Sequence, residues 1–366
     1  MTLLRLFAIF SVLLISSQAF CEKGMEYYTI DEYFKINKQQ KELTKIFSEK
    51  VTEKSKPIRK RFKSPIRIAV VYPAIQQSSY WRDSVKSMTA RLDESGIKYE
   101  LLKYYSRPSG NYRLQAMHLN EASKGNMDYI ILSVDNSNVR RLIPALLTKD
   151  KPKIMIQNLT TPIKNWDAHK PFMYVGFDHI EGSKMIAEHY SKMFPEGANY
   201  LLLYGSKGTV STLRGGGFES YGLSKGFVPV AKYYTDFDFQ KSYKATKSAL
   251  KKHNNIRFVY ACSTDIALGA SKAIDEAGLI GKIIVNGWGG TINELELIRK
   301  KKLDFTVMRM NDDNGVAISE AIKMDIMGNG NSVPDIFSGE FVTITKEMTW
   351  ETISTYIERA LRYSGK

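Results

Sequence analysis

The chain has 366 residues, of which 43% are hydrophobic and 25% are charged, with a formal net charge of +15 at pH 7. This composition is typical of a folded globular protein and excludes a disordered or collagen-like chain. The length exceeds that of one typical domain and predicts two.

Residues 1–19 have the layout of a secretory signal peptide. Arg5 gives a basic start, the run from Leu6 to Ile15 is almost entirely apolar, and Ser17 and Ala19 are small residues near the cleavage point. The run is shorter than the roughly 20 residues that cross a bilayer, and an interfacial anchor is the alternative. We therefore expect export to the periplasm. Export argues against nucleic acid as the partner of the basic charge and favours an anionic ligand, a membrane surface or an acidic protein.

The two cysteines, Cys21 and Cys262, leave two interpretations open. An exported chain can oxidise them to a disulfide, whereas the apolar run from Phe258 to Ala261 suits a buried free thiol at Cys262. Phe20 is bulkier than the residue that usually precedes a lipidated cysteine, so lipidation of Cys21 is not expected. No Cys and His residues have metal-ligand spacing, and we expect neither a metal nor another cofactor.

Residues 20–65 are expected to form a basic, largely helical N-terminal extension. Between Lys35 and Lys63 the chain carries eleven Lys or Arg residues. A solvated helix and linker explain this density, and a docking surface is the alternative.

Beyond the extension, runs rich in β-branched and aromatic residues alternate with amphipathic stretches. In the first series, strands are predicted at 67–72, 99–104, 128–134 and 153–157, with helices near 81–92, 114–122 and 139–147. After Gly176 a second series predicts strands at 200–203, 230–234, 258–262 and 282–286, with helices near 183–193, 213–224, 242–253 and 267–277. The last part of the chain predicts strands at 304–308 and 340–344 around a helix at 316–327.

Two consecutive series of βαβ units predict an α/β protein with two doubly wound parallel-sheet lobes joined by a hinge. We assign residues 66–177 and 308–336 to an N-terminal lobe. Residues 178–307 and 340–366 are assigned to a C-terminal lobe. A single closed eight-stranded barrel is the alternative fold.

Ligands of open parallel sheets bind at the edge where the strands end, so the residues after each predicted strand are the candidates for a site. They are Gln76, Ser78, Trp81, Ser133, Asp135, Asn158, Thr264, Asp265, Trp288 and Arg309, with Arg214 at a predicted helix start. Indole rings cover the apolar face of a compact polyhydroxylated ligand, while amide, hydroxyl and carboxylate groups bind its hydroxyls.

Most of these residues also have a purely structural explanation. Ser78, Ser133 and Thr264 are suited to cap the helices that follow them. Trp81 continues an apolar helix stripe, so packing explains it equally well. Trp288 has glycines on both sides, which favours an exposed ring that faces a ligand.

Arg309 lies between two methionines at a strand end, and a guanidinium group beside buried positions needs an acceptor. The acceptor is either an internal carboxylate, Asp312 or Asp313, or an anionic ligand.

The sequence lacks the phosphate-binding, zinc-binding and nucleophile-elbow motifs of common enzymes, and its five histidines form no recognisable ligand set. The run Gly215 to Gly217 lacks the strand-loop-helix setting of a dinucleotide site and is interpreted as a turn. We therefore expect a binding protein and not an enzyme.

Taken together, several blocks resemble the LuxP-type autoinducer-2 receptors of the periplasmic binding protein superfamily. The resemblance spans residues 65–364 in order and rests on Val70-Val71-Tyr72-Pro73, Gln76 with Ser78-x-Tyr80-Trp81, 157–162, 174–179, 260–265, 286–290 and 307–313. Ile75 departs from the pattern, as does Gly216, where an aspartate is expected.

The resemblance implies a ligand, a partner and roles for the candidate residues. The ligand is the furanosyl borate diester of autoinducer-2, an anion in which boron is part of the ligand. Its ring and diol oxygens would be bound by Gln76, Ser78, Trp81, Asn158, Thr264, Asp265 and Trp288. Arg214 and Arg309 would face the borate from opposite lobes, with Arg309 on the N-terminal one. The implied partner is the periplasmic domain of a LuxQ-type sensor kinase in quorum sensing.

Three other functions are weighed against this one. A periplasmic protein that delivers a pentose or hexose to an import transporter has the same fold. Its ligand binding would not depend on boron, whereas that of an autoinducer-2 receptor would. A sugar-responsive transcription regulator predicts an N-terminal helix-turn-helix and no signal peptide, and the sequence shows the opposite. An enzyme would turn its ligand over.

Overall fold

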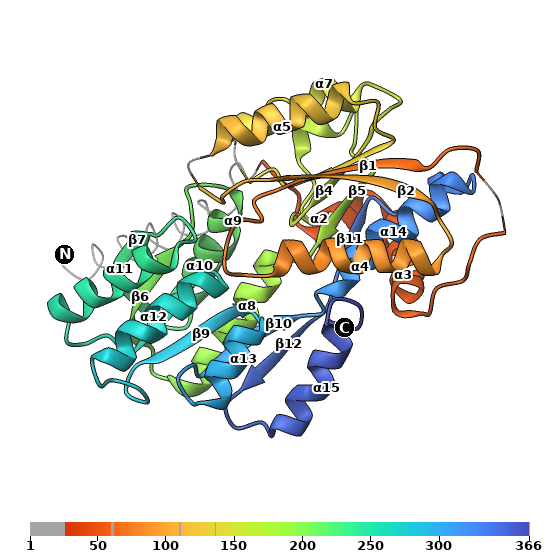
Figure 1. Cartoon of the computed structure of the whole chain (residues 1–366). Helices are drawn as coiled ribbons and strands as arrows, with labels where there is room; N and C mark the ends of the chain where they lie inside the picture. Colours follow the sequence, from red (N-terminus) through yellow and green to blue (C-terminus); the bar gives the residue numbers. More distant parts are fainter. Residues whose placement is uncertain (1–25, 60–61, 110, 136, 366) are drawn as a thin grey trace.

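The computed structural model describes residues 26–59, 62–109, 111–135 and 137–365, so the predicted signal peptide and Cys21 lie outside it. The described chain forms two α/β lobes, each built around its own six-stranded sheet (Figure 1). The predicted fold class is confirmed. The closed barrel is excluded, because the strands divide into two open sheets.

The first sheet is entirely parallel, in the order β11-β5-β4-β3-β1-β2. Its strands are β1 (Ile66–Tyr72), β2 (Tyr99–Tyr105), β3 (Tyr129–Leu132), β4 (Lys153–Gln157), β5 (Met173–Gly176) and β11 (Ile336–Ser338). One face is covered by α3 (Lys38–Thr52), α4 (Tyr80–Glu94) and α14 (Asp312–Ile326), the other by α5 (Tyr112–Lys124), α6 (Ser137–Arg140) and α7 (Pro144–Leu147). Val70 and Val71 of β1 therefore enter different cores, which explains the unbroken apolar run of that strand.

The second sheet has the order β12-β10-β9-β8-β6-β7, and only β12 is antiparallel to its neighbour. Its strands are β6 (Ala198–Tyr204), β7 (Phe227–Tyr234), β8 (Phe258–Ala261), β9 (Ile284–Gly289), β10 (Phe305–Arg309) and β12 (Phe341–Thr345). The helices of this lobe are α8 (His179–Met193), α9 (Thr209–Ser211), α10 (Gly217–Leu223), α11 (Phe239–Lys252), α12 (Thr264–Glu276), α13 (Ile292–Arg299) and α15 (Trp350–Ala360). Short helical turns are η1 (Lys164–Trp166), η2 (Thr212–Gly216) and η3 (Gly330–Ser332).

The chain crosses between the lobes after β5, after β10 and after β11, and these crossings are hydrogen-bonded to one another. The amide of Gly339 donates to the carbonyl of Gly176 at 2.8 Å, and the amide of Met310 donates to the carbonyl of Glu340 at 3.1 Å. Arg309 ends β10 and thus belongs to the second sheet, which corrects its expected place on the N-terminal lobe. The crossing follows this arginine because β10 pairs along its whole length with β12.

The glycine run at 215–217 is not a turn. It lies where the π-helix η2 passes into α10. A Cβ added at Gly215 would lie 2.2 Å from an atom of the Tyr204 ring. The helix therefore needs a glycine for close packing and not for chain reversal.

The N-terminal extension contains α2 (Ile30–Ile36) and α3, which pack on the first lobe. Phe47 and Val51 of α3 are buried in its core, and the Thr44 hydroxyl donates to the carbonyl of Ile336 at 3.0 Å. At the other end of the chain, the residues after α15 return to this lobe, where the Ser364 hydroxyl donates to Asp312 at 2.6 Å.

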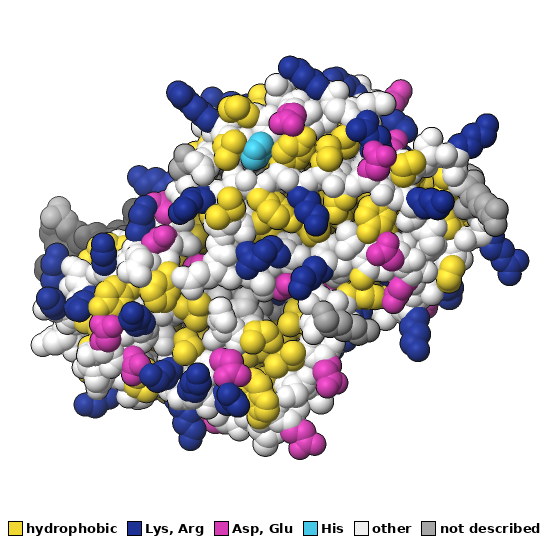
Figure 2. Space-filling view, in the orientation of Figure 1, with side chains coloured by type: hydrophobic (Ala, Val, Ile, Leu, Met, Phe, Trp, Pro, Cys, Tyr) yellow, Lys and Arg dark blue, Asp and Glu magenta, His cyan; other side chains and the backbone are white. Residues whose placement is uncertain are grey.

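Lys and Arg side chains are spread over the visible face of both lobes, with Asp and Glu between them (Figure 2). The net charge alone therefore does not locate a binding surface. Among the described residues, no helix has the length and apolar character needed to cross a membrane.

Candidate ligand-binding site

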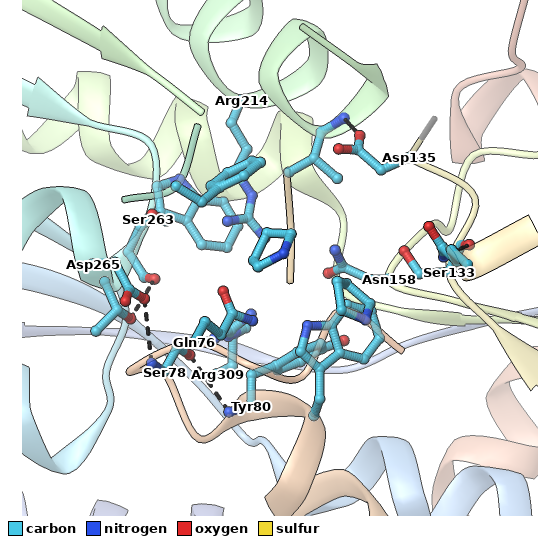
Figure 3. Close-up of a pocket in the computed structure, with 18 of the residues that line it drawn as sticks. Gln76, Ser78, Tyr80, Ser133, Asp135, Asn158, Arg214, Ser263, Asp265 and Arg309 are labelled. Atoms are coloured by element: carbon cyan, nitrogen blue, oxygen red, sulfur yellow. Dashed lines mark hydrogen bonds between the residues drawn. The ribbon is translucent and has the colours of Figure 1, made fainter. Parts of the chain in front are cut away.

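A cavity lies between the two lobes, at the edges where their strands end (Figure 3). It encloses about 670 Å³ of empty space, part of which is open to solvent. The structure brings all nine predicted ligand-binding residues into its lining: Gln76, Ser78, Trp81, Asn158, Arg214, Thr264, Asp265, Trp288 and Arg309. Figure 3 shows Arg214 pointing into the cavity from the top of the view, opposite Gln76 and Arg309.

Arg214, from η2, is 4% exposed and makes no ion pair with a carboxylate of the described residues. Its Nη1 donates to the carbonyl of Cys262 at 3.0 Å, and its Nε donates to Nδ1 of His179 at 3.2 Å. The guanidinium lies 3.7 Å from the centroid of the Trp288 ring. Burial and the nearby Arg309 lower the pKa of Arg214 to about 9, so the group is charged at neutral pH but poorly compensated.

Arg309 is 5% exposed, and its Nε is buried without a hydrogen-bond partner in the described chain. Its guanidinium lies 4.2 Å from the centroid of Tyr80 and 5.9 Å from that of Trp288. Burial lowers the pKa of this arginine also. Gly289 is a glycine because its φ of 130° is strained for any residue with a side chain, and a Cβ would also lie 2.4 Å from Nη2 of Arg309.

The internal salt bridge considered for Arg309 is not formed. Asp313 is paired with Arg359, at 2.8 Å, and with Arg362. Asp312 accepts the amides of Tyr363 and Ser364 at 2.7 and 2.8 Å. Both carboxylates are thus occupied by the C-terminal segment.

The expectation that Trp288 is exposed is wrong, since only 1% of its surface is accessible to solvent. Its ring packs edge-on against Phe341 and His179, with centroids 5.5 and 5.7 Å away, and a Cβ on Gly182 would lie 2.8 Å from it. The glycines beside it serve the close approach of neighbouring chain segments. The ring still lines the cavity, and its Nε1 has no hydrogen-bond partner in the described residues.

Trp81 both packs and lines the cavity. Its ring centroid lies 4.7 Å from that of Tyr72 and 4.8 Å from that of Tyr80. The packing explanation is therefore confirmed for this residue, and its contact with a ligand stays a prediction.

Asp265, at the start of α12, joins the lobes directly. Its carboxylate accepts the amides of Gln77 and Ser78 of the first lobe at 3.0 and 3.2 Å, and Figure 3 shows the bond to Ser78. Burial raises the pKa of this carboxyl. The hydroxyl of Ser78 accepts the amide of Tyr80 at 3.4 Å, in line with a local capping role, whereas that of Thr264 donates to the carbonyl of Trp288 at 3.4 Å.

Asn158 follows β4 and has a left-handed backbone with φ of 68°. An asparagine tolerates this conformation better than most residues. Its Oδ1 is buried without a partner in the described chain, as are Nε1 of Trp288 and Nε of Arg309. Unpaired buried polar atoms are rare and costly, and these three belong to residues that line one cavity.

Several residues that were not predicted from the sequence also line the cavity: Pro73, Tyr80, Pro108, Tyr112, Gln115, Val210, Phe237 and Ser263. Tyr80 and Ser263 are neighbours of selected residues, so proximity to a strand end would have found them. Tyr112 and Gln115 come from α5, where no strand-end signal exists. Among the described residues, no cluster of three or more Cys, His, Asp or Glu side chains is suited to hold a metal.

Cys262 has a buried thiol that forms no disulfide with another described residue, and burial raises its pKa to about 12. Its pairing with Cys21 stays a prediction, because Cys21 lies outside the described residues. The carbonyl of Cys262, as described above, accepts a hydrogen bond from Arg214. The side chain thus behaves as a small apolar group of the core.

Two sheet-centred lobes, with a cavity lined by polar and aromatic side chains between their strand ends, define a two-lobed ligand-binding protein. Residues 68–328 match the family described as "Periplasmic binding protein domain", and the chain belongs to this family.

Individual relatives are more distant. The ribose import binding protein RbsB of Escherichia coli (strain K12) is 29% identical over 143 residues, which are 39% of this chain and 48% of that protein. The chain therefore spans about half the length of the ribose import binding proteins that it matches. The D-allose-binding periplasmic protein of the same organism is 23% identical over 267 residues, 70% of this chain and 83% of the relative.

Solved structures share the fold. A periplasmic solute binding protein of an ABC transporter from Actinobacillus succinogenes 130z, with bound D-allose, has a TM-score of 0.68 at 20% identity and covers 80% of this chain and 100% of its own. A solute binding protein from Bacillus halodurans C-125, with bound myo-inositol, has a TM-score of 0.68 at 19% identity, covering 82% and 100%. At this identity the likeness concerns the fold.

Proposed function

We propose that the chain is an exported periplasmic receptor whose lobes close on a compact, polyhydroxylated and negatively charged ligand. The observation that carries this proposal is the pair of buried guanidinium groups, Arg214 and Arg309, which face one cavity and have no carboxylate partner in the described chain. Buried charges that are left unpaired are costly. An anionic ligand would supply the missing counter-charge.

The furanosyl borate diester of autoinducer-2 has the required chemistry. It carries a negative charge on the borate and several hydroxyl and ring oxygens. Charge-assisted hydrogen bonds contribute about 1.5–3 kcal/mol each, so two arginines would favour the borate adduct over its neutral, boron-free form. The orphaned Asn158 Oδ1 and Trp288 Nε1 would bind a hydroxyl and an oxygen of the ring.

Closure would carry the signal. A ligand shifts an open–closed equilibrium only through contacts that are better made in the closed state. The arginines come from the second lobe, whereas Gln76, Trp81 and Asn158 come from the first. A ligand held by both sets would therefore favour closure, and a LuxQ-type sensor domain that recognises the closed form would be the partner.

Delivery of a neutral pentose or hexose to an import transporter is the second candidate. It is favoured by the relatives, which are named for ribose and allose. The aromatic rings and hydroxyl-binding groups of the cavity suit such a sugar as well. The two candidates differ in the charge of the ligand.

Calorimetry of the mature protein separates them. Autoinducer-2 is titrated with and without boric acid, and D-ribose and D-allose are titrated in parallel. We expect tight binding only in the presence of boron, with a bound signal in the boron NMR spectrum. Tighter binding of either sugar, or binding of autoinducer-2 that is indifferent to boron, would support the import function instead.

A further inference from the structure

His179 lies behind the cavity and is not among its lining residues. It is the first residue of α8, directly after the chain crosses from the first lobe to the second, and it is 2% exposed. Its ring contacts Trp288 edge-on and bonds to residues of both lobes. The ligand chemistry proposed above does not use it.

Two hydrogen bonds fix the proton on this ring. A guanidinium group can only donate, so Nδ1 of His179 has to be the acceptor of the 3.2 Å bond from Nε of Arg214. The proton is then on Nε2, which donates to the carbonyl of Asn158 at 2.9 Å. The histidine is therefore neutral, and a second ring proton would break its bond to the arginine.

The surroundings agree with a neutral ring. Burial and the charge of Arg214 lower the pKa of His179 well below its ordinary value, and Arg309 acts in the same direction. The groups packed around it from η2, β9 and β10 are Arg214, Trp288 and Arg309, and no described carboxylate pairs with it.

We infer that His179 is a positioning residue that holds Arg214 toward the ligand and ties this arginine to the hinge. The inference rests on the proposed function, because it assigns a role in binding the anionic group. Arg214 is held at two points, Nη1 on the Cys262 carbonyl and Nε on the histidine, and two points fix the plane of a guanidinium. Without the second point the plane is free to turn.

Arg214 is linked to the hinge through Nε2 of His179, which donates to the carbonyl of Asn158. The Asn158 carbonyl belongs to the first lobe, at a residue whose left-handed backbone is set by the turn after β4. The chain Asn158–His179–Arg214 thus passes from one lobe, across the crossing, to a cation of the other lobe. A hinge movement that displaces Asn158 would displace Arg214, so the anion contact and closure are coupled.

Replacement of the histidine tests this role. His179→Phe keeps the ring contact with Trp288 but removes both hydrogen bonds, whereas His179→Asn restores an acceptor near the position of Nδ1. The matched control is His189→Phe on the same helix, whose ring packs on Phe305 at 4.1 Å and does not contact the arginine. Affinity is measured with autoinducer-2 plus boric acid and with autoinducer-2 alone.

We expect His179→Phe to lose tenfold or more in affinity for the boron adduct, with a smaller loss for the boron-free form. His179→Asn should regain most of the loss, and His189→Phe should bind like the wild type. Equal binding by His179→Phe and His189→Phe would overturn the inference alone. A wild-type protein that does not bind the boron adduct would overturn the proposed function and this role with it.

A nitrogen NMR spectrum of histidine-labelled wild-type protein gives a second readout, which does not depend on the ligand's identity. We expect His179 to be protonated at Nε2 only, and not to titrate between pH 8 and pH 5.5. A proton on Nδ1 would contradict the positioning role, because the bond to Arg214 would then be absent.

Discussion

The hydroxyl of Tyr27 lies 2.7 Å from the hydroxyl of Thr209, so the N-terminal extension reaches the second lobe. Tyr27 itself is docked on the first lobe, where it forms a β-bridge with Ile163. Close by, the carboxylate of Asp135 accepts the amide of Val210 at 2.7 Å. The lobes are thus joined by two contacts, of which only the second is made by residues that line the cavity, and these contacts favour the closed arrangement.

Tyr27→Phe keeps the ring and removes the hydroxyl, which bonds to Thr209 across the lobes and also accepts a hydrogen bond from Arg140 within the first lobe. A single hydrogen bond contributes about 1 kcal/mol, so we expect ligand affinity to fall roughly fivefold because closure is less favourable. Tyr28→Phe is the control, since among the described residues its hydroxyl bonds only to Asp167 of the first lobe, at 2.5 Å. Calorimetry gives the affinities, and X-ray scattering of the ligand-free proteins gives the closed fraction. Equal losses in the two variants would refute a role in closure.

Arg214→Met and Arg309→Met remove the two unpaired charges one at a time. Each change should weaken binding of the boron adduct by about 1.5–3 kcal/mol, and together they should abolish the preference for boron. Without ligand, Arg309→Met should not unfold at a lower temperature, because exchanging a buried, poorly compensated charge for an apolar group is often neutral or stabilising. Arg214→Met should unfold at a lower temperature, because it leaves the Cys262 carbonyl and Nδ1 of His179 without a donor.

Arg299→Met is the control for these two variants. Its side chain is half exposed and pairs with Glu296 on the surface of α13. Thermal unfolding and calorimetry are compared across the three proteins. Arginine variants that bind the boron adduct as tightly as Arg299→Met would show that the two guanidinium groups do not face the ligand's charge.

Gly182 controls the place of Trp288 from behind. A Cβ at this position would lie 2.8 Å from the indole and 3.0 Å from the ring of Phe341, both in packed surroundings. Gly182→Ala should therefore cost about 1–3 kcal/mol of stability and weaken ligand binding by displacing the indole. Gly216→Ala is the control, since nothing lies within 4 Å of its added Cβ. Urea unfolding and calorimetry check both variants. Similar behaviour of the two would mean that the indole tolerates the displacement.

The parts of the fold that the sequence predicted are those with a local signature. Strands such as β1 and β8 are buried on both faces, so each reads as an unbroken apolar run. The strand β11 has only three residues and owes its existence to pairing with β5, more than 150 residues earlier in the chain. No periodicity is detectable over so short a run, and α13 and α15 were also not predicted.

In the site, too, some features follow from local sequence patterns and others depend on residues that are distant in the chain. That the candidate residues meet in one cavity follows from the shared edge of parallel strands. That Arg309 has no ion pair with Asp313 does not follow from any local pattern. Asp313 is paired instead with Arg359 and Arg362, which lie near the C-terminal end of the sequence. The burial of Trp288 likewise depends on Phe341, which comes from a different crossing.

Stability should depend on pH through His179. In the folded protein, burial and Arg214 hold its pKa well below the ordinary value of 6.5, whereas the unfolded chain takes up this proton near pH 6.5. Below pH 6.5 the unfolded state therefore binds the additional proton, and the free energy of unfolding falls as the pH falls. At pH 5.5 the loss is on the order of 1 kcal/mol, and above pH 7.5 it vanishes.

Urea unfolding of the wild type and of His179→Phe at pH 7.5 and pH 5.5 isolates this contribution. Buried carboxyls such as Asp265 and Asp312 have a raised pKa and act in the opposite direction, since the stability that they contribute by binding a proton in the fold is complete only below about pH 3.8 and is lost as the pH rises. Both proteins contain these carboxyls, so their effect cancels in the comparison. The wild type should lose on the order of 1 kcal/mol more than the variant on acidification. A stability difference between the two proteins that is the same at both pH values would mean that His179 takes up its proton as readily in the fold as in the unfolded chain, and its bond from Arg214 would then not persist in solution.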